Sequence, residues 1–309
     1  MNFEKYATSG YFVGNKIIDN NQIVNLRKLI LKNFKRNKMD KELQFVHFDA
    51  DLRSCIIKLF TSNIIKEFLI NNSSLTDVAI IPIIQVMKNY HVNRIKTPGI
   101  GWHRDCGGEF NYKYSNSLLS DKKYIFGKIG IYLQENSSNL GGGIDLIPKS
   151  HFYIKNKNYL KRKINGIFLK VLQLFQKYLP NIYKLIPEKI YLMFLKAIKI
   201  KAEPGCPVFF DSRIIHRGTP INDFLINSLK EIDNIHYEIP DNNAKITIYC
   251  QFGSSTAISS YLYDRVRRNS KSNILKNWFE EIELYKEFSS ELYNSAINIM
   301  KNVELKELI

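Results

Sequence analysis

Two stretches near the N-terminus space their apolar residues as amphipathic helices do. Between residues 14 and 38, apolar side chains recur three or four positions apart, which places them on one helix face. They are Ile17, Ile18, Ile23, Leu26, Leu29, Ile30 and Phe34. Residues 51–71 show the same pattern and end at the turn-forming sequence NNSS. We therefore expect a helical N-terminal flank over residues 1–75.

The pattern changes after residue 75. Short runs rich in Ile, Val, Phe and Tyr, bounded by Gly, Pro and Asn, predict strands. These runs are AIIPIIQVMKNYHV, FGKIGIYLQE, PVFFDSRII and AKITIYCQFG. Because turns separate them, an antiparallel sandwich or barrel is favoured over βαβ units. Residues 270–309 return to helical spacing, which predicts C-terminal helices.

The segment 152–201 interrupts the strand-rich region with a different pattern. Its apolar residues fall at helical spacing, and Pro180 and Pro187 break the run. Between residues 155 and 201 there are twelve Lys or Arg and one Glu, a net charge of +11. We interpret this segment as a basic helical insertion.

Composition adds limits to this picture. The 309 residues carry a formal charge of +16, and 45% of them are hydrophobic. A chain of this length and composition can bury a full core, so global disorder is excluded. The four cysteines form no CxxC pair, and neither a signal peptide nor about 18 consecutive apolar residues is found. We expect a cytoplasmic protein, with a peripheral position at the inner membrane surface as one possibility.

A histidine and a carboxylate form the first candidate for chemistry. His103 and Asp105 lie two residues apart in WHRDCGGE, and in an extended strand such residues point to the same face. His216, 113 residues later in DSRIIHRGTP, can supply a third ligand. Two histidines and one carboxylate form the facial triad of non-haem Fe(II) oxygenases. An H-x-D pair alone is common by chance, so the surrounding sequence decides its meaning.

The surrounding sequence resembles the phytanoyl-CoA dioxygenase family of Fe(II)/2-oxoglutarate oxygenases. That family has a WHxD-type pair, a Gly-rich turn before a PGSH-like segment, and a Pro-Gly stretch leading to H-x-G. The corresponding residues are Trp102, His103 and Asp105; 141–143, Ile147, Pro148, Ser150 and His151; and Pro204, Gly205, Phe209, His216, Gly218 and Asn222. The resemblance covers about residues 85–252, with the basic segment as an insertion.

The resemblance implies the fold and the domain organisation. We expect one oxygenase domain over residues 1–309, of α+β class with a mainly β core. The core would be a double-stranded β-helix, the cupin-like jelly roll, formed by residues 76–151 and 202–255. Helices would flank this core, and the basic helical insertion would interrupt it.

The resemblance also implies the reaction. His103, Asp105 and His216 would bind Fe(II), and 2-oxoglutarate would chelate the iron. With O2, the cosubstrate would be converted to succinate and CO2 while an unactivated carbon of the substrate is hydroxylated. Related halogenases lack the carboxylate ligand, so Asp105 favours hydroxylation. The substrate would be a small molecule or a lipid- or sugar-linked compound.

The chain departs from the family at the cation that binds the second carboxylate of 2-oxoglutarate. The family normally has an Arg on the strand after the second histidine, and Lys245 takes its place here, after a longer connection. Alternation puts Lys245, Thr247, Tyr249 and Gln251 on one face of this strand. Lys245 and Thr247 resemble the Arg-x-Ser carboxylate clamp of related oxygenases, so we expect Lys245, Thr247 and Tyr249 to bind 2-oxoglutarate. Lysine binds a carboxylate as a point charge, without the bidentate fork of arginine. Arg213 and Arg217 remain alternatives for this role.

The basic insertion has three interpretations. It is a solvated lid on the core, an interfacial helix that contacts an anionic membrane, or a nucleic-acid-binding segment. We expect no nucleic acid, because the Arg-x5-Arg pattern of the nucleic-acid-repairing oxygenases is absent after His216. The competing functional class is a non-catalytic basic β-barrel that binds anionic membranes or acidic polymers.

Overall fold

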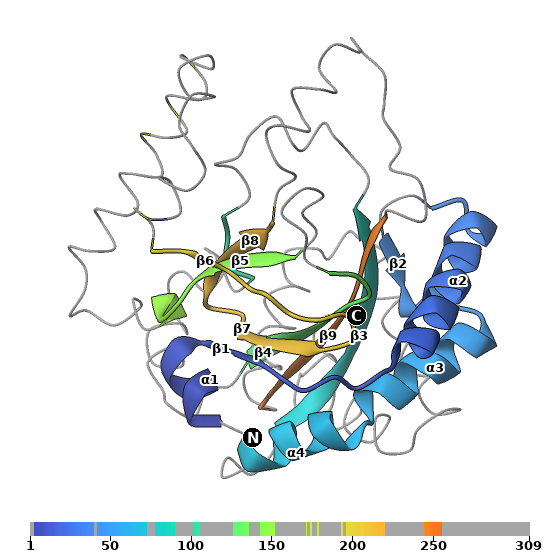
Figure 1. The fold of residues 1–309 in the computed structure, drawn as a ribbon, viewed down its shortest axis with the longest axis horizontal. Helices are drawn as coiled ribbons and strands as arrows, with labels where there is room; N and C mark the ends of the chain where they lie inside the picture. The colour runs from blue at the N-terminus through green and yellow to red at the C-terminus, as the bar shows by residue number, and fades with distance from the viewer. Residues whose placement is uncertain are drawn as a thin grey trace, which may run out of the picture.

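The computed structural model describes residues 3–39, 42–72, 78–89, 102–105, 126–135, 143–151, 196–219 and 244–254, together with Val171, Leu174, Tyr178 and Met193 (Figure 1). The α-helices are α1 (Phe3–Ser9), α2 (Asn20–Arg36), α3 (Ala50–Phe60) and α4 (Asn63–Asn72), with a 3₁₀ turn at Phe45–His47. The strands are β1 (Tyr11–Val13), β2 (Glu42–Gln44), β3 (Val78–Asn89), β4 (Phe126–Tyr132), β5 (Ile144–Ile147), β6 (Ile198–Lys199), β7 (Pro207–Asp211), β8 (Ile215–Gly218) and β9 (Lys245–Ser254).

The first predicted helix is confirmed, and its N-terminus has a capping box. The Asp19 side chain accepts a hydrogen bond from the backbone of Gln22, and the Gln22 side chain accepts one from the backbone of Asp19, each at 2.8 Å. These two bonds satisfy amide groups that the first helical turn leaves without partners. Helix α2 therefore begins at Asn20, six residues after the predicted start of the apolar pattern.

The helical pattern of residues 51–71 corresponds to two helices rather than one. The structure divides residues 50–72 into α3 and α4, with the interruption at Thr61 and Ser62. Both the backbone N–H and the hydroxyl of Thr61 donate to the carbonyl of Ile57, each at 2.9 Å. This side-chain bond to the preceding turn competes with helix continuation, so α3 ends at Phe60.

The strands form two separate antiparallel sheets, and in the described residues neither closes into a barrel. The large sheet has the order β1-β7-β4-β9-β3-β2, and the small sheet has the order β6-β5-β8. A bridge between His103 and His216 adds a further segment beside β8.

From β3 onward the chain alternates between the sheets. It runs from β3 in the large sheet to the His103 bridge, back to β4, then to β5 and β6 in the small sheet. Strand β7 returns to the large sheet, β8 to the small one and β9 to the large one. This alternation is that of a jelly roll, so the expected double-stranded β-helix is confirmed.

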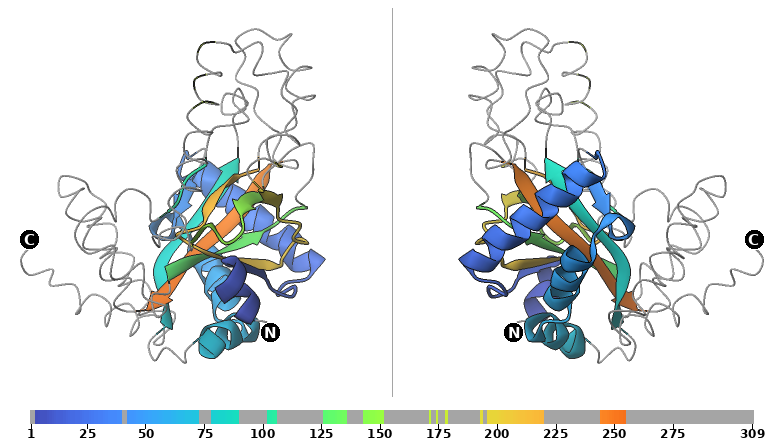
Figure 2. Two further views of the ribbon diagram at one scale, coloured as in Figure 1. Left: turned by 90° about the vertical axis from the view of Figure 1, so that its left-hand side faces the viewer. Right: turned by 90° about the vertical axis from the view of Figure 1, so that its right-hand side faces the viewer.

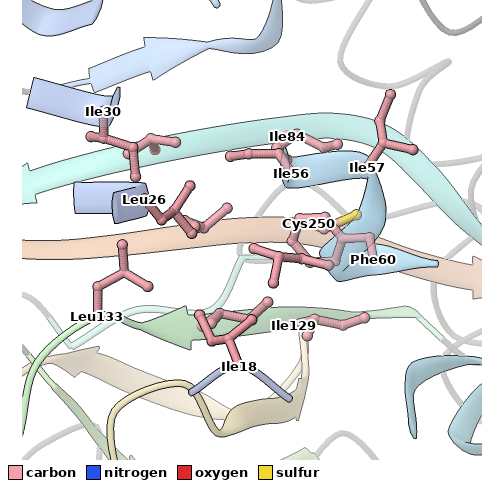
Figure 3. Packing of buried hydrophobic residues seen from close by; sticks show 14 of the residues in the cluster. Ile18, Leu26, Ile30, Ile56, Ile57, Phe60, Ile84, Ile129, Leu133 and Cys250 are labelled. Carbon is pink, nitrogen blue, oxygen red and sulfur yellow. The ribbon is translucent and has the colours of Figure 1, made fainter. Parts of the chain in front are cut away.

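Helices cover one face of the large sheet. In the side views α2 and α3 lie across this sheet, and α4 lies near one end of it (Figure 2). Their apolar side chains meet alternate strand residues such as Ile129, Ile248 and Phe252 in one buried cluster. Figure 3 shows side chains of the helices and of the strands pointing toward one another in this cluster. The opposite face of the sheet turns toward the small sheet, with Phe210, Leu146 and Ile214 between them.

Other sequence predictions are only partly covered by the structure. The C-terminal helices of 270–309 lie outside the described residues, as does nearly all of the insertion. Strand β6 lies at Ile198–Lys199, inside the range assigned to the insertion, and pairs with β5. The jelly roll therefore resumes before residue 202. No helix in the part of the chain that the structure describes is long and apolar enough to cross a membrane.

Phe209 packs among the rings of Phe12, Phe68 and Phe252, so truncation of its side chain should cause a large loss of stability. Phe209 is fully buried and its ring stacks on Phe68 at 3.8 Å between centroids. We expect Phe209→Ala to lower the free energy of unfolding by about 3–5 kcal/mol, because a buried ring leaves a cavity. Val24→Ala, at a position that is 50% exposed on α2, should change it by less than about 0.5 kcal/mol. Chemical denaturation of both variants measures the difference.

Candidate metal centre

The site is built on a backbone pairing between two distant segments. His103 N–H donates to the carbonyl of His216, and His216 N–H donates to the carbonyl of His103, both at 2.9 Å. The two imidazole rings lie 4.4 Å apart between centroids. A pair of residues 113 positions apart in the sequence is thereby held directly opposite each other.

Asp105 completes a cluster of three possible ligands. Its Oδ1 lies 3.6 Å from Nε2 of His103, and its Oδ2 lies 3.5 Å from Nε2 of His216. One ligand atom from each residue lies within 4.8 Å of the others. The predicted H-x-D pair and the distant histidine therefore converge on one point.

The hydrogen bonding of His216 leaves its Nε2 available as a ligand. Its Nδ1 lies 3.0 Å from the carbonyl of Ile214, so the ring donates its Nδ1 proton there and keeps the Nε2 lone pair toward Asp105. Burial lowers the pKa of His216 to about 4, although Asp105 opposes this shift. The imidazole is therefore neutral at neutral pH, as a metal ligand must be.

Lys128 provides a positive charge beside the triad. It lies on β4, and its Nζ is 3.1 Å from Oδ1 of Asp105. Burial raises the pKa of Asp105, but Lys128 and the two histidines outweigh it and hold this pKa well below its usual value. Asp105 is therefore ionised throughout the physiological range.

A buried ion pair supports the strand that carries His216. Nε of Arg217 donates to Oδ2 of Asp145 at 2.9 Å, and the hydroxyl of Thr219 donates to Oδ1 at 2.8 Å. The guanidinium also lies 4.8 Å from the ring centroid of Trp102. Arg217 and Trp102 each neighbour a histidine of the triad in sequence, so this stack connects the two segments of the bridge.

Three of the residues predicted to bind 2-oxoglutarate already have partners within the chain. Arg213 forms an ion pair with Asp211, and Arg217 forms one with Asp145, so each arginine already binds a carboxylate of the chain. Nζ of Lys245 donates to the carbonyl of Glu135 at 2.8 Å.

Tyr249 lies beside Lys128, the lysine that contacts Asp105. Its ring centroid lies 5.9 Å from Nζ of Lys128, and its hydroxyl lies 3.4 Å from that of Tyr132. Thr247 is on the same strand face as Tyr249 and pairs with Tyr132. The roles of all these residues toward 2-oxoglutarate stay predictions.

The sequence interpretation missed Lys128 and Asp145. Each is a single charged residue inside a short, otherwise apolar strand, FGKIGIY and IDLI respectively. A charged side chain in such a run is costly to bury unless it has a partner, and that cost is the signal that could have singled them out.

No family model matches the chain, and no curated protein sequence matches it. Solved structures with similar folds include the non-haem α-ketoglutarate-dependent epimerase SnoN from nogalamycin biosynthesis, with 10% identity and a TM-score of 0.44, covering 82% of this chain and 81% of SnoN. EctD from S. alaskensis has 14% identity and a TM-score of 0.44, covering 82% and 76%. EvdO2 from Micromonospora carbonacea var. aurantiaca, complexed with 2-oxoglutarate, has 12% identity and a TM-score of 0.41, covering 81% and 89%. At these levels of likeness, the function has to be argued from the residues of this chain.

The residues of the triad fit a divalent metal ion. Oδ2 of Asp105 is buried, yet it accepts no hydrogen bond from the described residues. Two imidazole nitrogens and one carboxylate oxygen are the donor set of non-haem Fe(II) sites that keep open positions. The His103 side chain is 54% exposed whereas that of His216 is 7% exposed, so the site is accessible from the His103 side.

His151, the histidine of the IPKSH segment, has a different environment. Its Nε2 lies 3.2 Å from the carbonyl of Ala7, which connects the end of the β5 loop to α1. Gly10, with a φ of +82°, gives the ring room, since a Cβ there would lie 2.5 Å from its Nδ1. Burial lowers the pKa of His151 despite the charge of Asp211.

The lowered pKa of His151 predicts a dependence of stability on pH. The unfolded chain binds a proton at this residue near pH 6.5, whereas the folded chain binds it only at lower pH. Its contribution is therefore present above about pH 6.5 and is lost as the pH falls toward its native pKa. We expect His151→Gln to lose less unfolding free energy than the wild type between pH 7.5 and 5.5, measured by denaturation at both values. Equal losses would contradict this assignment.

Proposed function

We propose that the chain is an Fe(II)- and 2-oxoglutarate-dependent dioxygenase that hydroxylates an unactivated carbon and releases succinate and CO2. The observation that carries the proposal is the convergence of His103, Asp105 and His216, from separate segments of a jelly roll, within 4.8 Å. The ordered motifs around them further support a place in the phytanoyl-CoA dioxygenase family. When bound, Fe(II) with 2-oxoglutarate and O2 would supply the oxidising chemistry.

The residues of the chain prepare this site in three ways. The backbone pairing fixes the distance between the two histidines, so little conformational freedom remains to be lost when an ion binds. The carbonyl of Ile214 orients His216, and the carboxylate of Asp105 faces both imidazoles. The exposed side of His103 is the direction from which a substrate would approach.

Anaerobic binding of Fe(II) and 2-oxoglutarate tests the site directly. We expect a weak visible charge-transfer band in the wild type when both are present, because 2-oxoglutarate would then chelate the bound iron. The band should be lost in His103→Ala, which removes one ligand, and retained in His47→Ala. His47 is a suitable control because its ring accepts a hydrogen bond from Gln44, in the 3₁₀ turn rather than in the site. Absence of the band in the wild type would refute the assignment.

The alternative is a non-catalytic basic protein that binds anionic membranes or acidic polymers. It explains the charge of the chain but gives no reason for a buried carboxylate between two histidines. Formation of succinate coupled to O2 uptake separates the two functions, since a binding module produces none.

We also propose a peripheral membrane contact through residues 155–201, which would suit a lipid-linked substrate. Val171, Leu174 and Tyr178 follow helical spacing and are 39%, 53% and 65% exposed, and Met193 is 68% exposed. Exposed apolar residues within a segment of net charge +11 are typical of helices that bind anionic interfaces.

Flotation with lipid vesicles tests this contact. The wild type should float with vesicles that contain phosphatidylglycerol and much less with pure phosphatidylcholine, because the basic segment is attracted to anionic headgroups. Leu174→Asp should reduce flotation, since it puts a charge on the apolar stripe. Val24→Asp is the matched control, because Val24 is an equally exposed apolar residue on α2. Equal flotation with both lipids would leave the lid interpretation of the insertion.

A further inference from the structure

We infer that Lys128 exchanges its ion pair when the metal site fills: it leaves Asp105 and binds a carboxylate of the acidic cosubstrate. This inference rests on the proposed function and assigns the cation that the family resemblance leaves open. Its basis is the contact of 3.1 Å between Nζ of Lys128 and the carboxylate of Asp105.

The contact implies competition between Lys128 and a metal ion. Asp105 is the one carboxylate in the His103–Asp105–His216 cluster: its Oδ1 faces the ammonium, and its Oδ2 accepts no hydrogen bond from the described residues. The two oxygen atoms share one negative charge, so an ion bound at either of them competes with Lys128 for that charge. Once Asp105 binds an ion, Lys128 keeps less of the attraction of that carboxylate and is repelled by the ion. The side chains of Lys128 and Asp105 are only 19% and 13% exposed, so solvent screens such repulsion weakly and an added anion is favoured there.

The formal charges support the same conclusion. Two neutral imidazoles, one carboxylate and a divalent ion leave one net positive charge, and Lys128 adds a second. The two carboxylates of 2-oxoglutarate would cancel both charges. A metal-free site, in which Lys128 and Asp105 neutralise each other, has no such demand. Metal binding is therefore expected to precede cosubstrate binding.

The surroundings of Lys128 suit a group that changes partners. Across the large sheet Lys128 pairs with Phe210 on β7 and with Gln251 on β9. Gln251 is 4% exposed, and its side-chain oxygen accepts no hydrogen bond from the described residues. It can therefore accept a hydrogen bond from Lys128 or from a bound ligand. The Phe210 ring lies 5.0 Å from that of His216, which brings this row of residues against the triad.

Lys245 is the matched alternative on the same sheet. It lies six residues from Gln251 along β9, about 20 Å of extended strand, and donates to the carbonyl of Glu135. A molecule as short as 2-oxoglutarate, bound to the metal, is therefore expected to reach Lys128 more easily than Lys245.

The test measures two affinities anaerobically, that of Fe(II) by equilibrium dialysis and that of 2-oxoglutarate by the visible band. Lys128→Met should weaken 2-oxoglutarate binding about 10- to 100-fold, through loss of a charge-assisted hydrogen bond. The same variant should bind Fe(II) several-fold more tightly, because a competing cation is removed. Changes of opposite sign are not expected from a merely structural lysine. Lys128→Arg should keep most of the cosubstrate affinity, and Lys245→Met should change neither affinity.

The outcomes separate the inference from the function on which it rests. No 2-oxoglutarate binding by the iron-loaded wild type would refute the proposed function. Normal wild-type binding with an unchanged affinity in Lys128→Met would overturn the role of Lys128 alone. A loss in Lys245→Met instead would assign the cation to Lys245. If Lys128→Met does not fold, Lys128→Gln provides the same comparison with a polar side chain beside Gln251.

Discussion

The site depends on one pair of backbone hydrogen bonds, those between His103 and His216. They join a short segment to β8 and so bring the H-x-D pair beside the second histidine. Backbone pairing in a sheet fixes which residues lie opposite each other and how far apart they are, because the hydrogen bonds set the register and the spacing of neighbouring strands. The jelly roll makes the pairing possible by returning the chain to the small sheet at both places. The rest of the structure holds this pairing in place.

Two packing layers do so on opposite sides. The helices close the outer face of the large sheet with a continuous apolar cluster, which leaves its inner face to carry polar groups. On that inner face Lys128, Tyr132 and Tyr249 lie among apolar neighbours and bond to one another or to the triad. The small sheet contributes the ion pair between Asp145 and Arg217. Substitution of either residue alone would leave the other as an unpaired buried charge. Lys128, Tyr132, Tyr249, Asp145 and Arg217 thus each have a partner in the described part of the chain, and these contacts hold the side chains around the triad in fixed positions.

Much of this arrangement could be predicted from the sequence. Helical spacing located α2, because this helix buries one regular face. Short apolar runs bounded by turn residues located the strands β3, β4, β7 and β9. All residues of β7 and nearly all of β4 are buried, so these two strands show no alternation. The triad could be predicted because its residues lie in recognisable local motifs. The edge strands β1 and β2 could not, since three residues are too few to show a period. Pairings across the fold, such as Arg217 with Asp145, depend on register and have no local signal.

The charge of the chain illustrates the same limit. Of the formal +16, the segment 155–201 accounts for +11, so a count of lysines directs attention to the insertion. The lysine that contacts the triad lies instead in an apolar strand, where composition gives it no weight. Burial is what makes the difference: a charge in solvent is screened, whereas one beside Asp105 acts at short range in a medium of low polarity. The electrostatics of the metal site therefore follow from the position of Lys128 and not from the net charge of the chain.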